Sequence, residues 1–372
     1  MGFKCGIVGL PNVGKSTIFN AITNAGAESA NYPFCTIDPN VGMVNVPDKR
    51  LDKLVAAYKP RSIVPAVTQF VDIAGLVKGA AQGEGLGNQF LTHIRECEAI
   101  MEVVRCFEDE NIIHVLENID PLRDVEIIET ELILKDLESV EKRLSQEQKN
   151  ARIGTAKAKD RLFACEQLAK YLGEGKVARN FLSGAAFSEP QKEAAGEIIF
   201  ELALLTAKPI FYCANVSENE VLTGNAHTEK LTAYAKERGQ DVVIICGKIE
   251  EELSELEAAE KAEFLNDLGM AESGLDQVVH KGYSILGLRT FFTAGEKEVR
   301  AWTFHKGWKA PACAGVIHTD FEKGFIRAET LGYADFEKYG SLNAAKDAGH
   351  LRTEGKEYEV QDGDIMLFLF NS

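Results

Sequence analysis

The sequence lacks the features that mark secreted, zinc-binding or membrane-spanning proteins. Its eight cysteines include no C-x-x-C pair, and no histidine lies at the spacing of a metal-binding motif. No stretch of 18 apolar residues occurs, and residues 1–10 lack the basic start and long apolar segment of a signal peptide. We therefore expect a cytoplasmic protein with reduced thiols, no structural zinc and no membrane partner.

Positive charge is also scarce. The chain has 41 Lys and Arg residues against 57 Asp and Glu, which gives a formal net charge of −16. This balance argues against a surface that is basic all over, although a local basic patch remains compatible with it. With 372 residues and 45% hydrophobic content, the chain can bury a large core and form two or three domains.

One motif is strong. Residues 9–16 read Gly-Leu-Pro-Asn-Val-Gly-Lys-Ser, between an expected strand over Phe3–Leu10 and a helix that opens over Thr17–Thr23. In this pattern Lys15 reaches the β- and γ-phosphates of a nucleotide, and the Ser16 hydroxyl ligates Mg²⁺. The loop amides and the helix N-terminus surround the phosphates. The residues expected to bind nucleotide here are Asn12, Val13, Gly14, Lys15, Ser16 and Thr17.

Two further segments have the character of nucleotide switches. Ala30–Asn40 carries two prolines and reads as an extended loop, from which Thr36 is expected to reach Mg²⁺. Val64–Ile73 reads as one apolar strand that ends near Asp72, where a carboxylate supporting Mg²⁺ belongs. Five glycines lie between positions 75 and 87, and the Gly75 amide is expected to sense the γ-phosphate.

The residue that orients the attacking water does not stand at its usual position in this sequence. Leu76 stands where Ras-like GTPases place a glutamine, and leucine has neither a donor nor an acceptor. Either a partner completes the site or another polar side chain enters it. His93 and His114 are the candidates, and we prefer His114 because a polar, loop-like segment precedes it.

The base-binding motif favours adenine. After a strand over Pro209–Ala214 the chain reads Asn215-Val216-Ser217-Glu218, where GTPases read Asn-Lys-x-Asp. Val216 removes the lysine stem that packs over the base, and Glu218 displaces the carboxylate that reads guanine. We therefore expect Asn215, Val216 and Glu218 to bind a purine nucleotide, ATP rather than GTP.

Residues 131–199 predict an antiparallel helical hairpin, because apolar residues repeat there at three and four positions. The tip of the hairpin is basic, which suits either a solvated face or a contact with a phosphate backbone. The cations of this tip are Lys149, Arg152, Lys157, Lys159 and Arg161.

From about residue 282 the pattern changes to short alternating strands, which predicts a separate α+β module. Cations and aromatic residues alternate in it, as in surfaces that bind RNA, although outward charges also serve solubility alone. The cations are Lys297, Arg300, Lys306, Lys309, Lys323 and Arg327, and the aromatic residues are Trp302, Phe304, Trp308 and Phe325. The expected domains are 1–130 with 200–281, then 131–199, then 282–372.

Taken together, these motifs resemble the YchF family, Obg-related P-loop nucleotidases with a C-terminal TGS domain. The resemblance spans nearly the whole chain. It implies an ATPase that associates with ribosomes in bacteria, with a mostly parallel α/β sheet, an inserted coiled-coil hairpin and a β-grasp-like last domain. Leu76 matches the hydrophobic residue that marks the family, and His114 matches the place of a catalytic histidine.

Two positions add detail to this resemblance. Asn12 resembles the residue through which related GTPases hold K⁺, which makes K⁺ a possible cofactor. Cys246-Gly247-Lys248 departs from the Ser-Ala-Lys form of the fifth GTPase motif. We expect a Mg²⁺-dependent ATPase with slow intrinsic hydrolysis that acts as a switch on the ribosome or RNA. The alternatives are an Obg-type GTPase and an RNA-binding scaffold in which nucleotide is structural.

Overall fold

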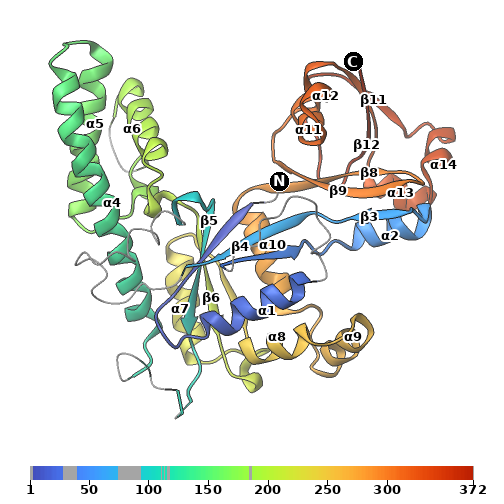
Figure 1. The fold of residues 1–372 in the computed structure, drawn as a ribbon, viewed down its shortest axis with the longest axis horizontal. Helices are drawn as coiled ribbons and strands as arrows, with labels where there is room; N and C mark the ends of the chain where they lie inside the picture. The colour runs from blue at the N-terminus through green and yellow to red at the C-terminus, as the bar shows by residue number, and fades with distance from the viewer. Residues whose placement is uncertain are drawn as a thin grey trace.

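A computed structural model describes residues 3–27, 40–73, 94–109, 111–112, 114, 118–183 and 187–371. Figure 1 shows a central sheet from which a group of long helices and a second, C-terminal sheet stand out in different directions. Over the part of the chain that is described, every helix is too short or too polar to cross a membrane.

Among the described residues, the first sheet has six strands in the order β2-β4-β1-β5-β6-β7, and only β2 runs antiparallel. Every residue of β5 and β6 is buried, as expected for parallel strands covered on both faces. The predicted α/β class with a mostly parallel sheet is therefore confirmed. The strands are β1 (Lys4–Val8), β2 (Val41–Asn45), β4 (Val67–Asp72), β5 (Ala99–Arg105), β6 (Ile210–Asn215) and β7 (Val242–Ile245).

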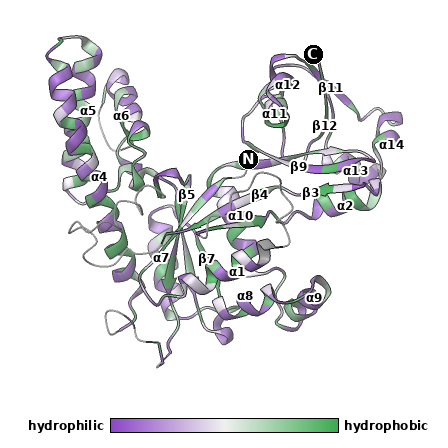
Figure 2. Cartoon of the chain, viewed as in Figure 1, coloured by the Kyte–Doolittle hydropathy of each residue, from purple (hydrophilic) through white to green (hydrophobic). Residues whose placement is uncertain are grey.

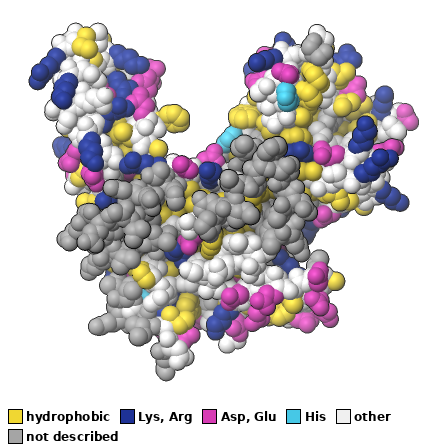
Figure 3. All heavy atoms as spheres, viewed as in Figure 1, with side chains coloured by type: hydrophobic (Ala, Val, Ile, Leu, Met, Phe, Trp, Pro, Cys, Tyr) yellow, Lys and Arg dark blue, Asp and Glu magenta, His cyan; other side chains and the backbone are white. Residues whose placement is uncertain are grey.

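Helices connect these strands and pack against the sheet. The segment from Glu250 to Leu265 spans two helices, because Glu257 caps the second one and Glu260 accepts a hydrogen bond from the Glu257 amide. Acidic side chains gather over these two helices, α8 and α9 (Figure 3). The helices of this part are α1 (Lys15–Ala27), α2 (Lys49–Tyr58), α7 (Ala226–Glu237), α8 (Gly247–Ser254), α9 (Ala258–Asp267) and α10 (Gly274–Ile285).

The prediction of a single strand over Val64–Ile73 is wrong. Val64 ends β3 (Ser62–Val64), which pairs in parallel with β9 (Glu298–His305) of the C-terminal sheet. The strand of the first sheet, β4, begins only at Val67. Pro65 stands between them and has no N–H to continue a ladder. One short segment therefore contributes to both sheets.

Where the inserted segment is described, three helices form a group with its own apolar core. α4 (Pro121–Ala151) and α5 (Ala156–Gly173) form the predicted antiparallel pair, and α6 (Glu189–Glu201) packs against α5. Figure 2 shows that their outward faces are largely hydrophilic. Their shared core includes Ile133, Val140, Cys165, Leu168, Leu172, Ala195 and Ile198. Short 3₁₀ turns lie at Ala178–Asn180, Leu205–Ala207 and Glu218–Glu220.

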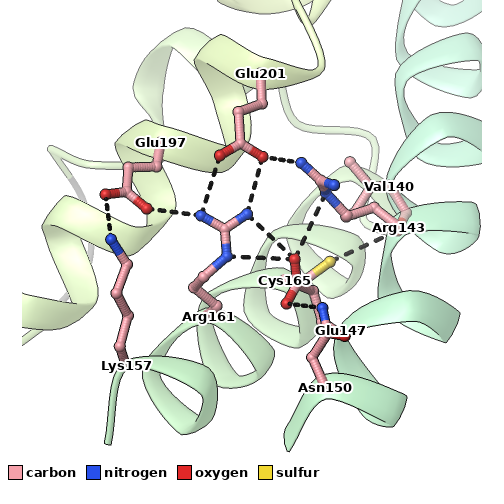
Figure 4. A network of polar contacts seen from close by, with 9 residues as sticks. All are labelled: Val140, Arg143, Glu147, Asn150, Lys157, Arg161, Cys165, Glu197 and Glu201. Carbon is pink, nitrogen blue, oxygen red and sulfur yellow. Dashed lines mark hydrogen bonds and ion pairs between the residues drawn. The ribbon is translucent and has the colours of Figure 1, made fainter.

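Part of the expected basic tip is used inside this group (Figure 4). Arg161 is only 13% exposed and donates to Glu147 at 3.1 Å, Glu197 at 2.6 Å and Glu201 at 2.9 Å. Lys157 also contacts Glu197. Arg161 is therefore held within the group and is not an exposed cation of the tip, whereas Lys157 remains 71% exposed. Lys149, Arg152 and Lys159 are exposed and form no ion pair with the described residues.

The C-terminal part is an α+β module, as predicted. Its sheet has the order β11-β10-β12-β8-β9-β3. The remaining elements are β8 (Leu288–Ala294), β10 (Phe325–Leu331), β11 (Arg352–Glu354), β12 (Ile365–Phe370), α11 (Ala310–Ile317), α12 (Thr319–Lys323), α13 (Tyr333–Tyr339) and α14 (Leu342–Asp347).

The aromatic residues expected at an RNA surface of this module are mostly interior. Phe304 and Phe325 are 1% and 4% exposed and belong to the core that α11 covers. The Trp302 ring stacks on Phe291, and its Nε1 donates to Thr293 Oγ1 at 2.9 Å. Trp308 alone of the four is exposed, at 38%. Phe304 and Phe325 therefore belong to the core and do not offer rings at the surface of this module.

Candidate nucleotide site

The phosphate loop joins β1 to α1 and places backbone amides at the helix N-terminus. Two of its residues have left-handed backbones, Asn12 with φ 64° and Gly14 with φ 91°. A Cβ on Gly14 would lie 2.1 Å from Asn215 Nδ2, so glycine is needed here for space as well as for backbone angle. The loop and the positive end of the α1 dipole together form an anion-binding site.

Lys15 and Asp72 are in direct contact beside this loop. The Lys15 ammonium donates to Asp72 Oδ1, and their side chains are only 12% and 15% exposed. The contact arises because β1 and β4 are parallel neighbours, with Ile7 paired to Asp72. Both strands therefore end at the same edge of the sheet, with a cation and an anion side by side.

The residues at this edge suit Mg²⁺. Ser16 offers a hydroxyl and Asp72 a carboxylate, and both are the hard oxygen ligands that Mg²⁺ prefers. The contact with Lys15 places the Asp72 carboxylate directly beside the phosphate loop. Protein sites for this ion commonly use one or two side chains and complete the shell with phosphate and water. Thr36, the other expected ligand, lies outside the described residues.

Asn215 has a bridging position. Its Nδ2 donates to the Val13 carbonyl at 2.9 Å, and its Oδ1 accepts from the Gly247 amide at 3.0 Å. The side chain is buried, and both ends of its amide contact backbone. Asn215 therefore ties the phosphate loop to the start of α8.

A cavity of about 660 Å³ opens above these elements, within the size range of sites for small molecules. Most of the predicted nucleotide-binding residues line it together. They are Asn12, Gly14, Lys15, Ser16, Thr17, Asn215, Val216 and Glu218. Val13 does not line it, because its side chain is 1% exposed and packs into the core.

The end of the cavity opposite the phosphate loop carries the unusual base motif. Glu218 and Lys248 are exposed there, with 3.9 Å between Oε1 and Nζ. Val216 is 2% exposed, and its N–H donates to the Ile245 carbonyl at 2.9 Å. Val216 is therefore part of the cavity wall, and its amide is already used within the protein. Burial raises the pKa of the neighbouring Cys246 thiol, which keeps it neutral.

Comparison with known proteins places this geometry in a family. The family model YchF-GTPase_C, described as a protein of unknown function (DUF933), matches residues 288–371, and MMR_HSR1, a 50S ribosome-binding GTPase, matches residues 4–149. Proteins named "Ribosome-binding ATPase YchF" from Bacillus subtilis, Haemophilus influenzae and Escherichia coli O157:H7 are 56%, 52% and 51% identical to this chain, over 100% of each sequence. The chain belongs to the YchF family.

A solved structure supports the same assignment and the fold. The Schizosaccharomyces pombe YchF GTPase is 43% identical in sequence and superposes with a TM-score of 0.85. The match covers 99% of this chain and 98% of the S. pombe chain. The resemblance to YchF proteins read from the motifs is therefore confirmed across the three parts of the fold.

The structure does not bring His114 to the cavity. Its side chain is 2% exposed, and its Nε2 lies 2.9 Å from Oδ2 of Asp124 on α4. Asp124 also accepts from Arg123. In this arrangement the imidazole faces the inserted helices. Gly75, Leu76 and His93, the other residues predicted near the reacting phosphate, lie outside the described part of the chain.

Sequence reasoning missed one wall of the cavity. Phe107, Glu108, Asp109 and Ile112 line it, directly after β5. A signal for this wall was present in the sequence, because β5 ends in Arg105, an arginine inside a run of apolar residues. A buried arginine needs several acceptors, which a neighbouring loop can supply.

Proposed function

We propose that this chain is a Mg²⁺-dependent ATPase that acts as a slow molecular switch and associates with the ribosome. The observation that carries the proposal is a single cavity in which the phosphate loop and a non-guanine base motif meet. At the base end, Val216 stands where GTPases have the lysine that packs over the base, and Glu218 stands where they have the aspartate that binds guanine. The relatives named "Ribosome-binding ATPase YchF" support both the nucleotide and the partner.

The roles of the residues follow from the chemistry of phosphoryl transfer. Lys15 and the loop amides hold the β- and γ-phosphates. When nucleotide binds, Lys15 exchanges its contact with Asp72 for contact with the phosphates. Ser16 and Thr36 would hold Mg²⁺, with Asp72 supporting it through water, and the ion would supply positive charge next to the phosphates. Gly75 senses the γ-phosphate, and His114 assists the attacking water after leaving Asp124. Asn12 is the candidate contact for K⁺.

Calorimetric titration with ATP and GTP, each with Mg²⁺, tests the nucleotide. We expect tighter binding of ATP, and tighter binding of GTP would contradict the proposal. Lys15→Ala should weaken ATP binding about 100-fold, because it removes roughly two charge-assisted hydrogen bonds. Lys236→Ala is the matched control, because this exposed lysine of α7 does not line the cavity, and it should change affinity by less than about threefold.

A second experiment separates a switch from a scaffold. Hydrolysis should collapse in Lys15→Ala and should rise in the wild type when ribosomes are added. A scaffold would instead bind ribosomes equally well with and without nucleotide.

Turnover should also depend on K⁺, and equal rates in K⁺ and Na⁺ buffers would remove the role given to Asn12.

A further inference from the structure

Arg105 ends β5 and lies entirely inside the protein. Its residue exposure is 1%, and its guanidinium donates to three backbone carbonyls. Nε donates to Phe107 at 3.1 Å, Nη1 to Ile112 at 2.9 Å and Nη2 to Asp109 at 3.3 Å. The guanidinium carbon also lies 4.5 Å from the centre of the Phe107 ring. One side chain thus holds both ends of a short loop.

The loop that Arg105 holds is the wall of the nucleotide cavity that was not predicted from the sequence. Phe107, Asp109 and Ile112 each accept from Arg105 through their backbone and line the cavity. The wall begins beside the base motif, because Arg105 pairs with Asn215 in the sheet and the Cys106 amide donates to the Asn215 carbonyl at 2.8 Å. The wall therefore borders the base end of the site rather than the Lys15–Asp72 edge.

The chemistry of this contact requires arginine. A guanidinium presents five N–H donors in a rigid plane, and an ammonium cannot reach three separated carbonyls with the same geometry. Among the described residues, no carboxylate lies within ion-pair distance of Arg105; the charges of Asp109 and Asp124 act on it from farther away. Burial lowers the pKa of Arg105, so the loop carbonyls are its main compensation for lost hydration.

We infer that Arg105 is a positioning residue that builds the nucleoside end of the site by fixing Phe107, Asp109 and Ile112 before nucleotide binds. The inference rests on the proposed nucleotide-binding function and deepens it. A preformed wall reduces the entropy cost of ordering the loop when ligand binds. Because the wall borders the base end, it should raise the affinity for the nucleoside part and leave the affinity for the triphosphate part unchanged. Loss of Arg105 should therefore separate these two parts of the ligand.

The test compares Arg105→Lys with the wild type for two probes, ATP and inorganic tripolyphosphate, both with Mg²⁺. We expect ATP to bind about tenfold more weakly and KM to rise with kcat unchanged, while tripolyphosphate affinity stays within twofold. Arg179→Lys is the matched control. Arg179 is another poorly exposed arginine that donates to a backbone carbonyl, that of Lys208, away from the cavity, so neither affinity should change. Equal loss for both probes, or no loss for ATP, would overturn the inference.

A measurement on the unaltered protein guards against misfolding of the variant. The Asn111 and Ile112 amides donate within the loop, to Asp109 Oδ1 at 2.8 Å and to the Asp109 carbonyl at 3.2 Å. We expect their hydrogen exchange to be slow without nucleotide and to change little when ATP is added. Complete exchange within seconds in the free protein would refute a prebuilt wall. A wild type that binds no purine triphosphate would instead refute the proposed function.

Discussion

The side-chain amide of Asn215 donates to the carbonyl of Val13 at 2.9 Å and accepts from the amide of Gly247 at 3.0 Å. These two bonds join the end of β6 to the phosphate loop on one side and to α8 on the other. Gly14 leaves the space through which the Asn215 side chain passes. The base motif and the phosphate loop are therefore mechanically coupled by one buried residue.

Asn215→Asp should uncouple them. The change replaces the Nδ2 donor by an oxygen that faces the Val13 carbonyl, which costs about 2 kcal/mol and predicts an affinity for ATP about 30-fold weaker. Asn266→Asp is the control, because Asn266 is exposed on α9 and does not line the cavity, and it should bind ATP within about threefold of wild type. Calorimetric titration of both variants decides, and equal affinities would contradict the bridging role.

The phosphate loop could be predicted because its residues are adjacent in sequence and each acts locally. Gly14, Lys15 and Ser16 stand where the pattern places them, and the flanking strand and helix differ from prediction by only a few residues. The mostly parallel sheet was also readable, since apolar strands alternate with helices along the chain.

Features that depend on partners far away in the sequence could not be predicted from local patterns. Pro65 marks a break, but nothing local shows that Ser62–Val64 pairs with β9, more than 230 residues later. Alternating strands do not reveal that α11 covers the face carrying Phe304 and Phe325. Likewise, the sequence around Arg161 indicates an exposed charge. Its partners Glu197 and Glu201 lie on α6, 36 and 40 residues away in sequence.

Arg161→Met should loosen α6 from the inserted helices. It leaves Glu147, whose side chain is 2% exposed, without its closest cation, and removing one partner of a buried ion pair costs about 3 kcal/mol. Hydrogen exchange of the α5 and α6 amides should accelerate about 100-fold. Lys157→Met removes a lysine that is 71% exposed and also contacts Glu197, and should have little effect. Equal exchange in both variants would show that apolar packing alone holds α6.

Glu250 should give the stability a specific dependence on pH. Burial raises its pKa from an ordinary 4.5 to about 6, although its carboxylate accepts from the Gly274 and Leu275 amides. The folded state then binds a proton more tightly than the unfolded state. The contribution of this group to the free energy of unfolding is therefore present below pH 4.5 and is lost as pH rises through about 6.

Glu250→Gln does not titrate and isolates this contribution. Between pH 4.5 and 6.5 the wild type should lose about 1.5 kcal/mol relative to this variant, as the shift in pKa implies. The exposed neighbour Glu251, changed to Gln, should keep the wild-type profile. Urea-unfolding midpoints followed by circular dichroism measure the difference, and parallel profiles for wild type and Glu250→Gln would exclude the assignment.

Lys149 and Lys159 are two lysines with which the tip of the inserted helices could contact a phosphate backbone. Both are exposed and unpaired among the described residues, unlike Lys157 and Arg161. If they contact ribosomal RNA, changing both to Gln should weaken ribosome binding, and the slope of log affinity against log salt should fall by about 2, because each phosphate contact releases about one counterion. Changing the exposed lysines Lys230 and Lys236 of α7 to Gln removes the same charge elsewhere and should leave the slope unchanged. Sedimentation with ribosomes at several salt concentrations measures both slopes; equal slopes for the two double variants would mean that the tip is a solvated face.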